Sequence, residues 1–358
     1  MHIMKRLFTI AVLLLSALLA YGQQTRTYVV GFYNLENLFD VYDDPAKNDE
    51  QFLPEGSNNW TEAKYEKKLA NMAHVIAEMA KDNGRYHTIL GVSEVENRMV
   101  LEDLVSEPEI ADANYQIVHY DSPDNRGIDV ALLYKPEQFT FLDSESIPFT
   151  FEGSDLDFSD TDTETFRTRD ILMVHGTIDG EHFAFYVMHL PSRSGGKGGN
   201  LRSRGAEIAY QHALGMMEKY PGIKIVAMGD MNDNPTDPSM SDYFHGRKSL
   251  EETGEKDFFN PFYTMLKDGM GSICYQGTWS IFDQLLVNHS LAYAPDGGLQ
   301  IRQINKGYYG RVFKKRFMEA QTGQYKGYPL RTFSNGAFIN GYSDHYPTYI
   351  VISKTSSK

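Results

Sequence analysis

Four apolar segments of this chain end in the same way, with an acidic, amide or imidazole side chain within two residues of the last apolar residue. Continuous apolar runs of this length are typical of strands buried on both faces. Rigid strands hold the groups at their ends in fixed positions, so polar side chains there favour a functional site. The segments and the side chains that follow them are 28–33 with Asn34 and Glu36, 89–92 with Glu94, 182–188 with His189, and 225–228 with Asp230 and Asn232.

A fifth polar group, Ser343-Asp344-His345, precedes a further apolar segment. The strands predicted along the chain are 28–33, 88–92, 128–134, 170–177, 182–189, 224–228, 281–287 and 348–353, and Asp179-Gly180 is predicted to close a hairpin. A helix is predicted over 61–82, ended by Asn83-Gly84, and another over 202–218. Many strands and few helices favour an α/β fold, a four-layer α/β/β/α sandwich of two mixed sheets.

The first 22 residues have the pattern of a secretory signal peptide. Lys5 and Arg6 precede a short apolar run that ends in Ala20-Tyr21-Gly22. We therefore expect residues 23–358 to form a single domain, exported to the periplasm or secreted, with no membrane span after cleavage. An uncleaved anchor is the alternative. The only cysteine is Cys274, so no disulfide forms within the chain.

Charge does not by itself point to nucleic acid, because the net charge is −14. The segment 302–331 is an exception, with eight basic residues, one acidic residue and six aromatic residues. Basic groups between aromatic rings can hold a phosphate backbone and stack on bases. A solvated surface segment with its rings packed inward explains the same pattern, and the sequence leaves both possibilities open.

The oxygen-rich strand ends predict a site for a hard divalent cation, with Mg²⁺ first and Mn²⁺ or Ca²⁺ as alternatives. Two histidines, each with its own acidic neighbours, suit one general base and one general acid, as hydrolysis of a phosphate ester requires. The cation site and the two histidines together comprise Asn34, Glu36, Glu94, Asp230, Asn232, Asp344, His189 and His345.

The order of these motifs, with Asp283 between them, resembles the endonuclease/exonuclease/phosphatase superfamily and its deoxyribonuclease I-like members, including exported bacterial nucleases. The resemblance runs from residue 34 to residue 347. It implies that Glu94 is the principal metal ligand, with Asn34, Glu36 and Asp344 around the same ion.

The same resemblance implies the remaining roles. His345 would activate water while Asp283 holds its ring. Asp230 and Asn232 would orient water and phosphate, with Asn34 also contacting the substrate. His189 would protonate the leaving oxygen, supported by Asp121, and Arg169 would bind phosphate.

A glycine-rich basic segment, 192–204, follows His189 and leads into the predicted helix. Backbone N–H groups and basic side chains in such a segment can bind an anion, so Arg193 and Lys197 are predicted to contact phosphate. A flexible surface loop is the alternative.

These observations predict an exported, monomeric, metal-dependent phosphodiesterase, foremost a nuclease acting on DNA or RNA.

 The alternatives that the sequence leaves open are a phosphodiesterase acting on phospholipid head groups, an inositol or sugar phosphatase on the same fold, and a binding module without catalysis. A binding module would have no need for Glu94, Asp230, Asn232, Asp283 and His345 together. No obligate protein partner is expected.

Overall fold

The computed structural model describes residues 24–193, 198–305 and 307–356. The predicted signal peptide and Lys197 lie outside these residues. Within the described ranges, no helix is both long enough and apolar enough to cross a membrane.

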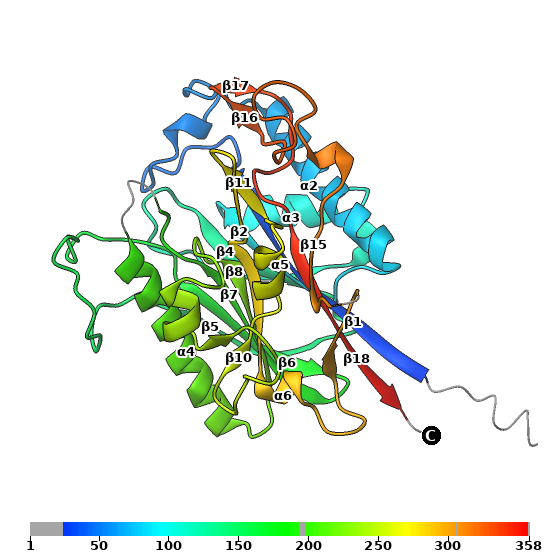
Figure 1. The fold of residues 1–358 in the computed structure, drawn as a ribbon. Helices are drawn as coiled ribbons and strands as arrows, with labels where there is room; N and C mark the ends of the chain where they lie inside the picture. Colours follow the sequence, from blue (N-terminus) through cyan, green and yellow to red (C-terminus); the bar gives the residue numbers. More distant parts are fainter. Residues whose placement is uncertain (1–23, 194–197, 306, 357–358) are drawn as a thin grey trace, which may run out of the picture.

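Two large mixed sheets form the centre of the molecule (Figure 1). The first has the strand order β14-β18-β1-β2-β4-β3, with β15 also paired to β18. Its strands are β1 (Gln24–Leu38), β2 (Ile89–Val95), β3 (Gln116–His119), β4 (Asp129–Tyr134), β14 (Gln300–Arg302), β15 (Gly310–Val312) and β18 (Thr348–Ser356).

The second sheet has the strand order β5-β6-β7-β8-β13-β10-β9. Its strands are β5 (Thr140–Ile147), β6 (Ile171–Ile178), β7 (Glu181–His189), β8 (Lys224–Asp230), β9 (Gly246–Arg247), β10 (Phe258–Phe259) and β13 (Asp283–Asn288). Two small hairpins stand apart from the sheets: β11 (Ile273–Tyr275) with β12 (Thr278–Ser280), and β16 (Phe333–Ser334) with β17 (Ala337–Phe338).

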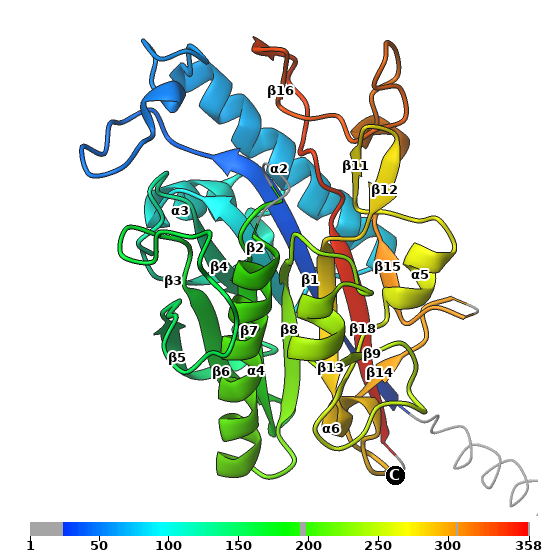
Figure 2. The same cartoon turned by 60° about the vertical axis from the view of Figure 1, so that its left-hand side comes forward.

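Three apolar cores hold four layers together. The inner faces of the two sheets share one core, in which Phe32 of β1 belongs to the same cluster as Val187 of β7 and Met228 of β8. A second core joins the first sheet to α2 (Glu62–Asn83) and α3 (Arg98–Ser106), and a third joins the second sheet to α4 (Gly199–Lys219). Figures 1 and 2 show these helices outside the sheets. The predicted α/β/β/α sandwich is therefore confirmed.

The remaining helices are short. They are η1 (Glu50–Phe52), η2 (Ala111–Ala113), η4 (Ser239–Tyr243), α5 (Tyr263–Lys267), α6 (His289–Ala292) and η5 (Arg316–Met318).

Each predicted strand and helix has a counterpart in the structure, with ends that differ by a few residues at most except for the extended β1. Helix α2 follows Thr61 and ends at Gly84, whose φ of 66° is left-handed. Asp179 and Gly180 both have positive φ and close the hairpin between β6 and β7. Helix α3 and strand β5 were not predicted, because α3 has only nine residues and β5 is mostly exposed.

Strand direction brings the predicted site residues to one edge. Strand β1 runs parallel to β2, and β7 runs parallel to β8, so each pair ends at the same edge of its sheet. In the second sheet, His189, Asp230 and Asp283 lie directly opposite one another on the adjacent strands β7, β8 and β13. The sheet topology therefore assembles residues that are far apart in the sequence.

His87, just before β2, is buried, and neither ring nitrogen has a hydrogen-bond partner within the part of the chain that the structure describes. Its ring lies edge-on to Tyr349 and fills the space left by Gly31, where an added Cβ would lie 2.7 Å from His87 Cδ2. Burial lowers the pKa of His87 to about 3.

This buried histidine predicts a loss of stability in acid. The unfolded chain takes up a proton near pH 6.5 and the folded chain only near pH 3, so the stability contributed by His87 is complete above pH 6.5 and falls as the pH drops. Lowering the pH from 7 to 5 should cost about 2 kcal/mol through this group. Denaturant unfolding of wild type and of His87→Leu at both pH values measures the difference, and equal pH dependence in the two proteins would contradict the prediction.

Candidate active site

Irregular backbone at the strand ends sets the direction of several site side chains. Glu36, Glu94 and Asn232 have φ values of 49°, 59° and 49°, in the left-handed region that side chains other than glycine rarely adopt. The pairing of β1 with β2 shifts register between Asn34 and Leu38, and a similar shift in the pairing of β2 with β4 surrounds Glu94. Such bulges redirect side chains at the mouth of a sheet and are common beside active sites.

Asn34 lies at the centre of the site and is fully buried. Its Nδ2 donates to Glu94 Oε1 at 3.1 Å and to Asp230 Oδ2 at 3.0 Å. Its Oδ1 accepts the backbone N–H of Glu36 at 2.8 Å, and its carbonyl accepts Ser343 Oγ at 2.8 Å. Asn34 thus connects the carboxylates of both sheets through its side-chain amide and the turn before β18 through its backbone carbonyl.

His345 and Asp283 form a buried pair. Asp283 Oδ2 lies 2.7 Å from His345 Nδ1, so the carboxylate fixes the ring and leaves Nε2 facing Asp230 Oδ2 at 3.7 Å. The backbone N–H of His345 donates to Ser343 Oγ at 3.0 Å. Burial lowers the pKa of His345, but the charges of Asp283, Asp230 and Asp344 outweigh burial and raise the pKa well above its usual value.

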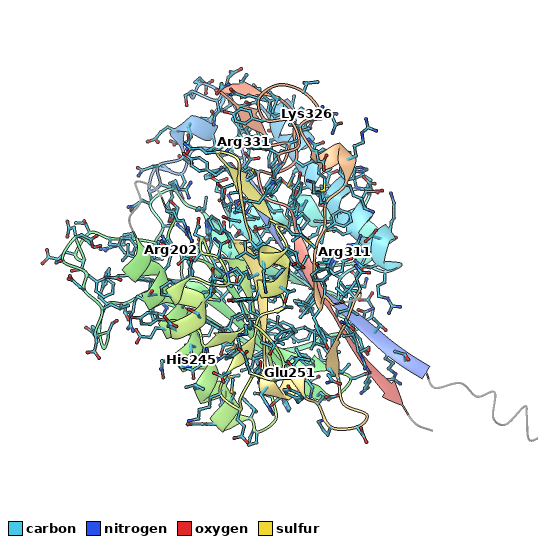
Figure 3. All side chains as sticks on the ribbon, in the orientation of Figure 1. Arg202, His245, Glu251, Arg311, Lys326 and Arg331 are labelled. Carbon is cyan, nitrogen blue, oxygen red and sulfur yellow. The ribbon has the colours of Figure 1, made fainter. Side chains whose placement is uncertain are left out.

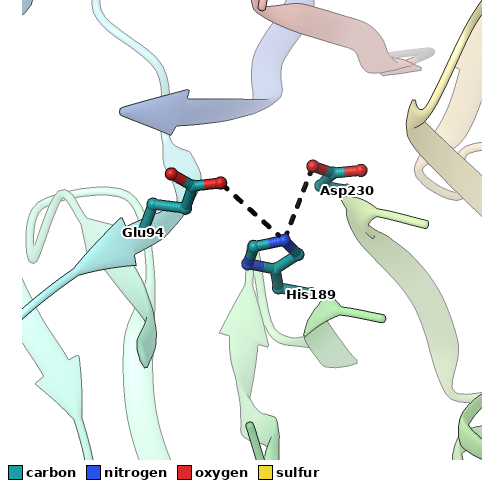
Figure 4. Close-up of side chains that lie close together, drawn as sticks. All are labelled: Glu94, His189 and Asp230. Atoms are coloured by element: carbon teal, nitrogen blue, oxygen red, sulfur yellow. Dashed lines mark ion pairs between the residues drawn. The ribbon is translucent and has the colours of Figure 1, made fainter. Parts of the chain in front are cut away.

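His189, at the end of β7, faces Glu94 and Asp230 (Figure 4). Its Nε2 lies 3.6 Å from Asp230 Oδ2 and 3.9 Å from Glu94 Oε1. Burial, with the positive charges of Arg169, Arg126 and His345, lowers the pKa of His189 well below its usual value. Burial also raises the pKa of Asp230 to about 7; the charge of His345 opposes this rise, and those of Asp283 and Glu94 add to it. The protein environment therefore shifts the pKa values of the two histidines in opposite directions.

These residues open into a cavity of about 460 Å³. Glu94, His189, Asp230, Asn232 and His345 form part of its wall. Three basic residues, Arg126, Arg167 and Arg169, also line it, together with Phe166, Thr168, Pro191, Ser192, Gly198 and Leu201. The cavity thus combines carboxylates that suit a cation with arginines that suit an anion.

The donor set fits a divalent cation. Ligand atoms of Glu94, His189 and Asp230 lie within 4.8 Å of one another, as do those of Asp230, Asp283 and His345. Glu94 Oε2 is held by the backbone N–H of Asn37 at 2.9 Å, which fixes the carboxylate without adding a positive charge. Concentrated, buried carboxylates of this kind are stabilised by a hard cation.

Two predicted metal ligands, Glu36 and Asp344, make a different contact. Arg331 Nε donates to Glu36 Oε1 at 3.1 Å and Arg331 Nη2 donates to Asp344 Oδ2 at 3.0 Å. Asn34 turns its amide nitrogen, not its oxygen, toward Glu94 and Asp230. In this arrangement Glu94 and Asp230 are the carboxylates that face the cavity.

The prediction that Asp121 supports His189 is wrong. The Asp121 side chain is 83% exposed, and its nearest imidazole is that of His119, at 4.0 Å. The chain turns outward after β3, and the buried Asp129 pairs with His119 Nε2 at 3.1 Å. His189 Nδ1 is buried and has no hydrogen-bond partner among the described residues.

Arg169 and Arg193, which were predicted to bind phosphate, already form ion pairs and hydrogen bonds with other groups of the protein. Arg169 lines the cavity but is buried, donating to Asp124 Oδ2 at 3.1 Å and to the carbonyls of His189 and Leu190. Arg193 pairs with Asp233 Oδ1 at 2.7 Å and also with Asp237. Both arginines therefore hold the strand ends in place, and Arg193 does not line the cavity.

Much of the basic charge in 302–331 is also paired. Arg311 and Lys315 both contact Asp82 of α2, at 2.9 and 2.7 Å, and Lys314 contacts Glu319 at 3.1 Å. Phe313 is fully buried. For these residues the structure favours a surface segment packed on the domain over an open nucleic-acid surface.

No site role was predicted for Lys68 or Arg126, although both lie at the site. Lys68 is completely buried and lies 3.8 Å from Glu36 Oε2, while Arg126 lines the cavity. Lys68 falls on the apolar face of α2 beside Tyr65 and Leu69, and a lysine at such a position is a signal for a buried partner. Arg126 carries no comparable signal.

The chain belongs to the endonuclease/exonuclease/phosphatase family, whose model matches residues 29–354. No curated protein matches the sequence.

Solved structures share the fold at low sequence identity. An endonuclease/exonuclease/phosphatase family protein from Bacteroides thetaiotaomicron has a TM-score of 0.54 at 14% identity, covering 93% of this chain and 97% of its own. TDP2 from D. rerio, complexed with a single-strand DNA product, has a TM-score of 0.52 at 12% identity, with coverages of 91% and 98%. A mannosyl-6-phosphatase from Bacteroides thetaiotaomicron has a TM-score of 0.52 at 14% identity, with coverages of 92% and 100%.

The buried Arg169–Asp124 pair predicts a large stability effect. Asp124→Ala leaves the Arg169 charge uncompensated and should cost about 3–5 kcal/mol of unfolding free energy. The matched control is Arg98→Met, which removes an i,i+4 pair with Glu102 whose side chains are 55% and 57% exposed, and it should cost under about 1 kcal/mol. Equal losses in the two variants, measured by denaturant unfolding, would contradict this account.

Proposed function

We propose that this protein is an exported, metal-dependent phosphodiesterase that hydrolyses DNA or RNA. The observation that carries the proposal is the His345–Asp283 pair, which faces His189 across Asp230 in a cavity that arginines also line. A base and an acid on either side of a phosphate site are what in-line attack of water on a phosphoester requires. Membership of the family supports the reaction class.

The residues of the chain divide the work of hydrolysis. His345 Nε2 accepts a proton from water while Asp283 holds the opposite ring nitrogen in the required tautomer. His189 donates a proton to the leaving oxygen, and the negative charge of a bound phosphate favours its protonated form. Asn232 fixes the cavity wall, because its Nδ2 donates to the carbonyl of Leu190 at 3.0 Å.

Glu94 and Asp230 would hold the divalent ion, foremost Mg²⁺. Bound there, the ion would polarise the phosphate and offset the carboxylate charge that keeps a proton on His345.

Two features support a nucleic-acid substrate. Arg126 and Arg167 line the cavity beside the reaction centre and add positive charge where a phosphate would lie. The hairpin of β11 and β12 flanks His345, to which Ile273 is paired by an isolated bridge. Tyr275, two residues after Ile273 in this hairpin, is 73% exposed, and an exposed ring can stack on a base. TDP2, which shares the fold, binds a single-strand DNA product.

A phosphatase acting on a small sugar phosphate is the second candidate. The cavity volume of about 460 Å³ is in the range of small-molecule sites. The similarity to a mannosyl-6-phosphatase is consistent with such a substrate.

Substrate trials distinguish these functions. Mature protein incubated with Mg²⁺ should cleave plasmid DNA or RNA, and EDTA should abolish cleavage. Turnover of mannose 6-phosphate alone would favour the second candidate, and turnover of phosphocholine lipid vesicles alone would favour a head-group phosphodiesterase. No turnover of any substrate with Mg²⁺, Mn²⁺ or Ca²⁺ would contradict the enzyme proposal.

His345→Ala should lower kcat by about 10²–10⁴-fold, because it removes the base. Asp283→Asn should also lower kcat, since it removes the charge that orients the ring. His212→Ala is the control: this histidine contacts Tyr186 and Glu145 away from the cavity and should leave the rate unchanged. Wild-type kcat in His345→Ala would refute the mechanism.

Export rests on the sequence pattern of residues 1–22. Mass measurement of the chain recovered from a secreting bacterial host tests it, with a new N-terminus near Gln23 as the expected result.

A further inference from the structure

Arg331 bridges two carboxylates at the edge of the active site. It reaches Glu36 at the end of β1 and Asp344 in the turn before β18, and each contact is a hydrogen bond of about 3 Å. In Figure 3, Arg331 lies near the end of the molecule that carries β16 and β17, away from His245 and Glu251. One guanidinium thus occupies the space between two acids that the sequence assigned to a metal ion.

Both carboxylate oxygens of Glu36 already accept a hydrogen bond. Its Oε1 accepts Arg331 Nε, and its Oε2 accepts the backbone N–H of Thr332 at 2.7 Å. Lys68 Nζ lies 3.8 Å from the same Oε2 and donates to Thr332 Oγ1 and to the carbonyl of Tyr342. A metal ion at Glu36 would lie beside the positive charges of Arg331 and Lys68, which repel it.

The backbone around Arg331 is tightly packed, so its position is built into the fold. A Cβ added to Gly341 would lie 2.0 Å from the Arg331 carbonyl oxygen and 2.3 Å from that of Leu330. The backbone N–H of Tyr342 donates to the Leu330 carbonyl at 2.6 Å. Only glycine at 341 allows the two backbone segments to approach so closely.

We infer that Arg331 acts as a built-in cation in place of a second metal ion, so that the site binds a single divalent ion at Glu94 and Asp230. The guanidinium and Lys68 compensate Glu36 and Asp344, whereas Glu94 is held by neutral donors, the amide of Asn34 and the backbone of Asn37. A charge of fixed position also holds Asp344, whose Oδ1 lies 3.9 Å from His345 Nε2. Arg331 is therefore a positioning residue. The inference rests on the proposed function only in assuming a resident divalent ion.

Metal stoichiometry tests the inference without substrate. Metal-stripped protein is titrated with Mn²⁺, and bound ions are counted by calorimetry and by the loss of the free Mn²⁺ electron paramagnetic resonance signal. Wild type should bind about one ion per chain, and Arg331→Met should bind about two, because Glu36 and Asp344 become available oxygen ligands. Arg331→Lys keeps the charge and should retain the wild-type stoichiometry.

Two further variants identify the site of the added ion. Arg331→Met combined with Glu36→Gln should return to about one ion, because the second site loses a carboxylate. Arg316→Met is the matched control, since Arg316 belongs to the same basic segment but contacts Gln321. Thermal melting confirms that each variant is folded.

The outcomes separate this inference from the proposed function. Two ions in wild type, or an unchanged count in folded Arg331→Met, would overturn the inference. One ion with the expected gain in Arg331→Met supports it even if no phosphoester is hydrolysed, which would contradict only the proposed function. No Mn²⁺ bound to any variant would overturn both.

Discussion

The amide of Asn34 joins the two sheets at the point where charge is most concentrated. It donates to Glu94 of the first sheet and to Asp230 of the second, and both contacts are buried or nearly so. Two carboxylates brought together in a medium of low polarity repel each other strongly unless donors lie between them. Asn34 supplies both donors from one side chain, while Ser343 ties its carbonyl to the turn that carries His345. The positions of the base, the acid and the cation ligands therefore depend on this residue.

The sequence predicted the strand ends well because two independent signals coincide there. An apolar run predicts a buried strand, and a polar group within two residues of its end predicts a functional site there, so Asn34, Glu94, His189 and Asp230 could be placed together before the fold was known. Parallel neighbours then meet at one edge, as β7 and β8 do. Asp283 was found only through the family resemblance, because its neighbours do not mark it as a partner of a histidine 62 residues away.

Contacts that depend on loops could not be predicted in the same way. Asp121 follows β3 by only two residues, yet the chain turns and exposes it, and Asp129 takes the buried position. Arg331 meets Glu36 across 295 residues of sequence, and no period or motif records such a contact. Lys68 is the exception, since a lysine within the apolar face of a helix already requires a buried acceptor.

Charge is arranged locally in a way that the net value of −14 conceals. Basic residues at 311 and 315 are used to hold α2 through Asp82, so they add little field at the cavity. Arg126 and Arg167, by contrast, line the cavity directly. A phosphate approaching the site therefore meets both arginines and carboxylates, and the carboxylates repel it unless a cation lies between them. That conflict is the strongest physical reason to expect a divalent ion in this site, because it would turn the carboxylate wall into part of the phosphate site.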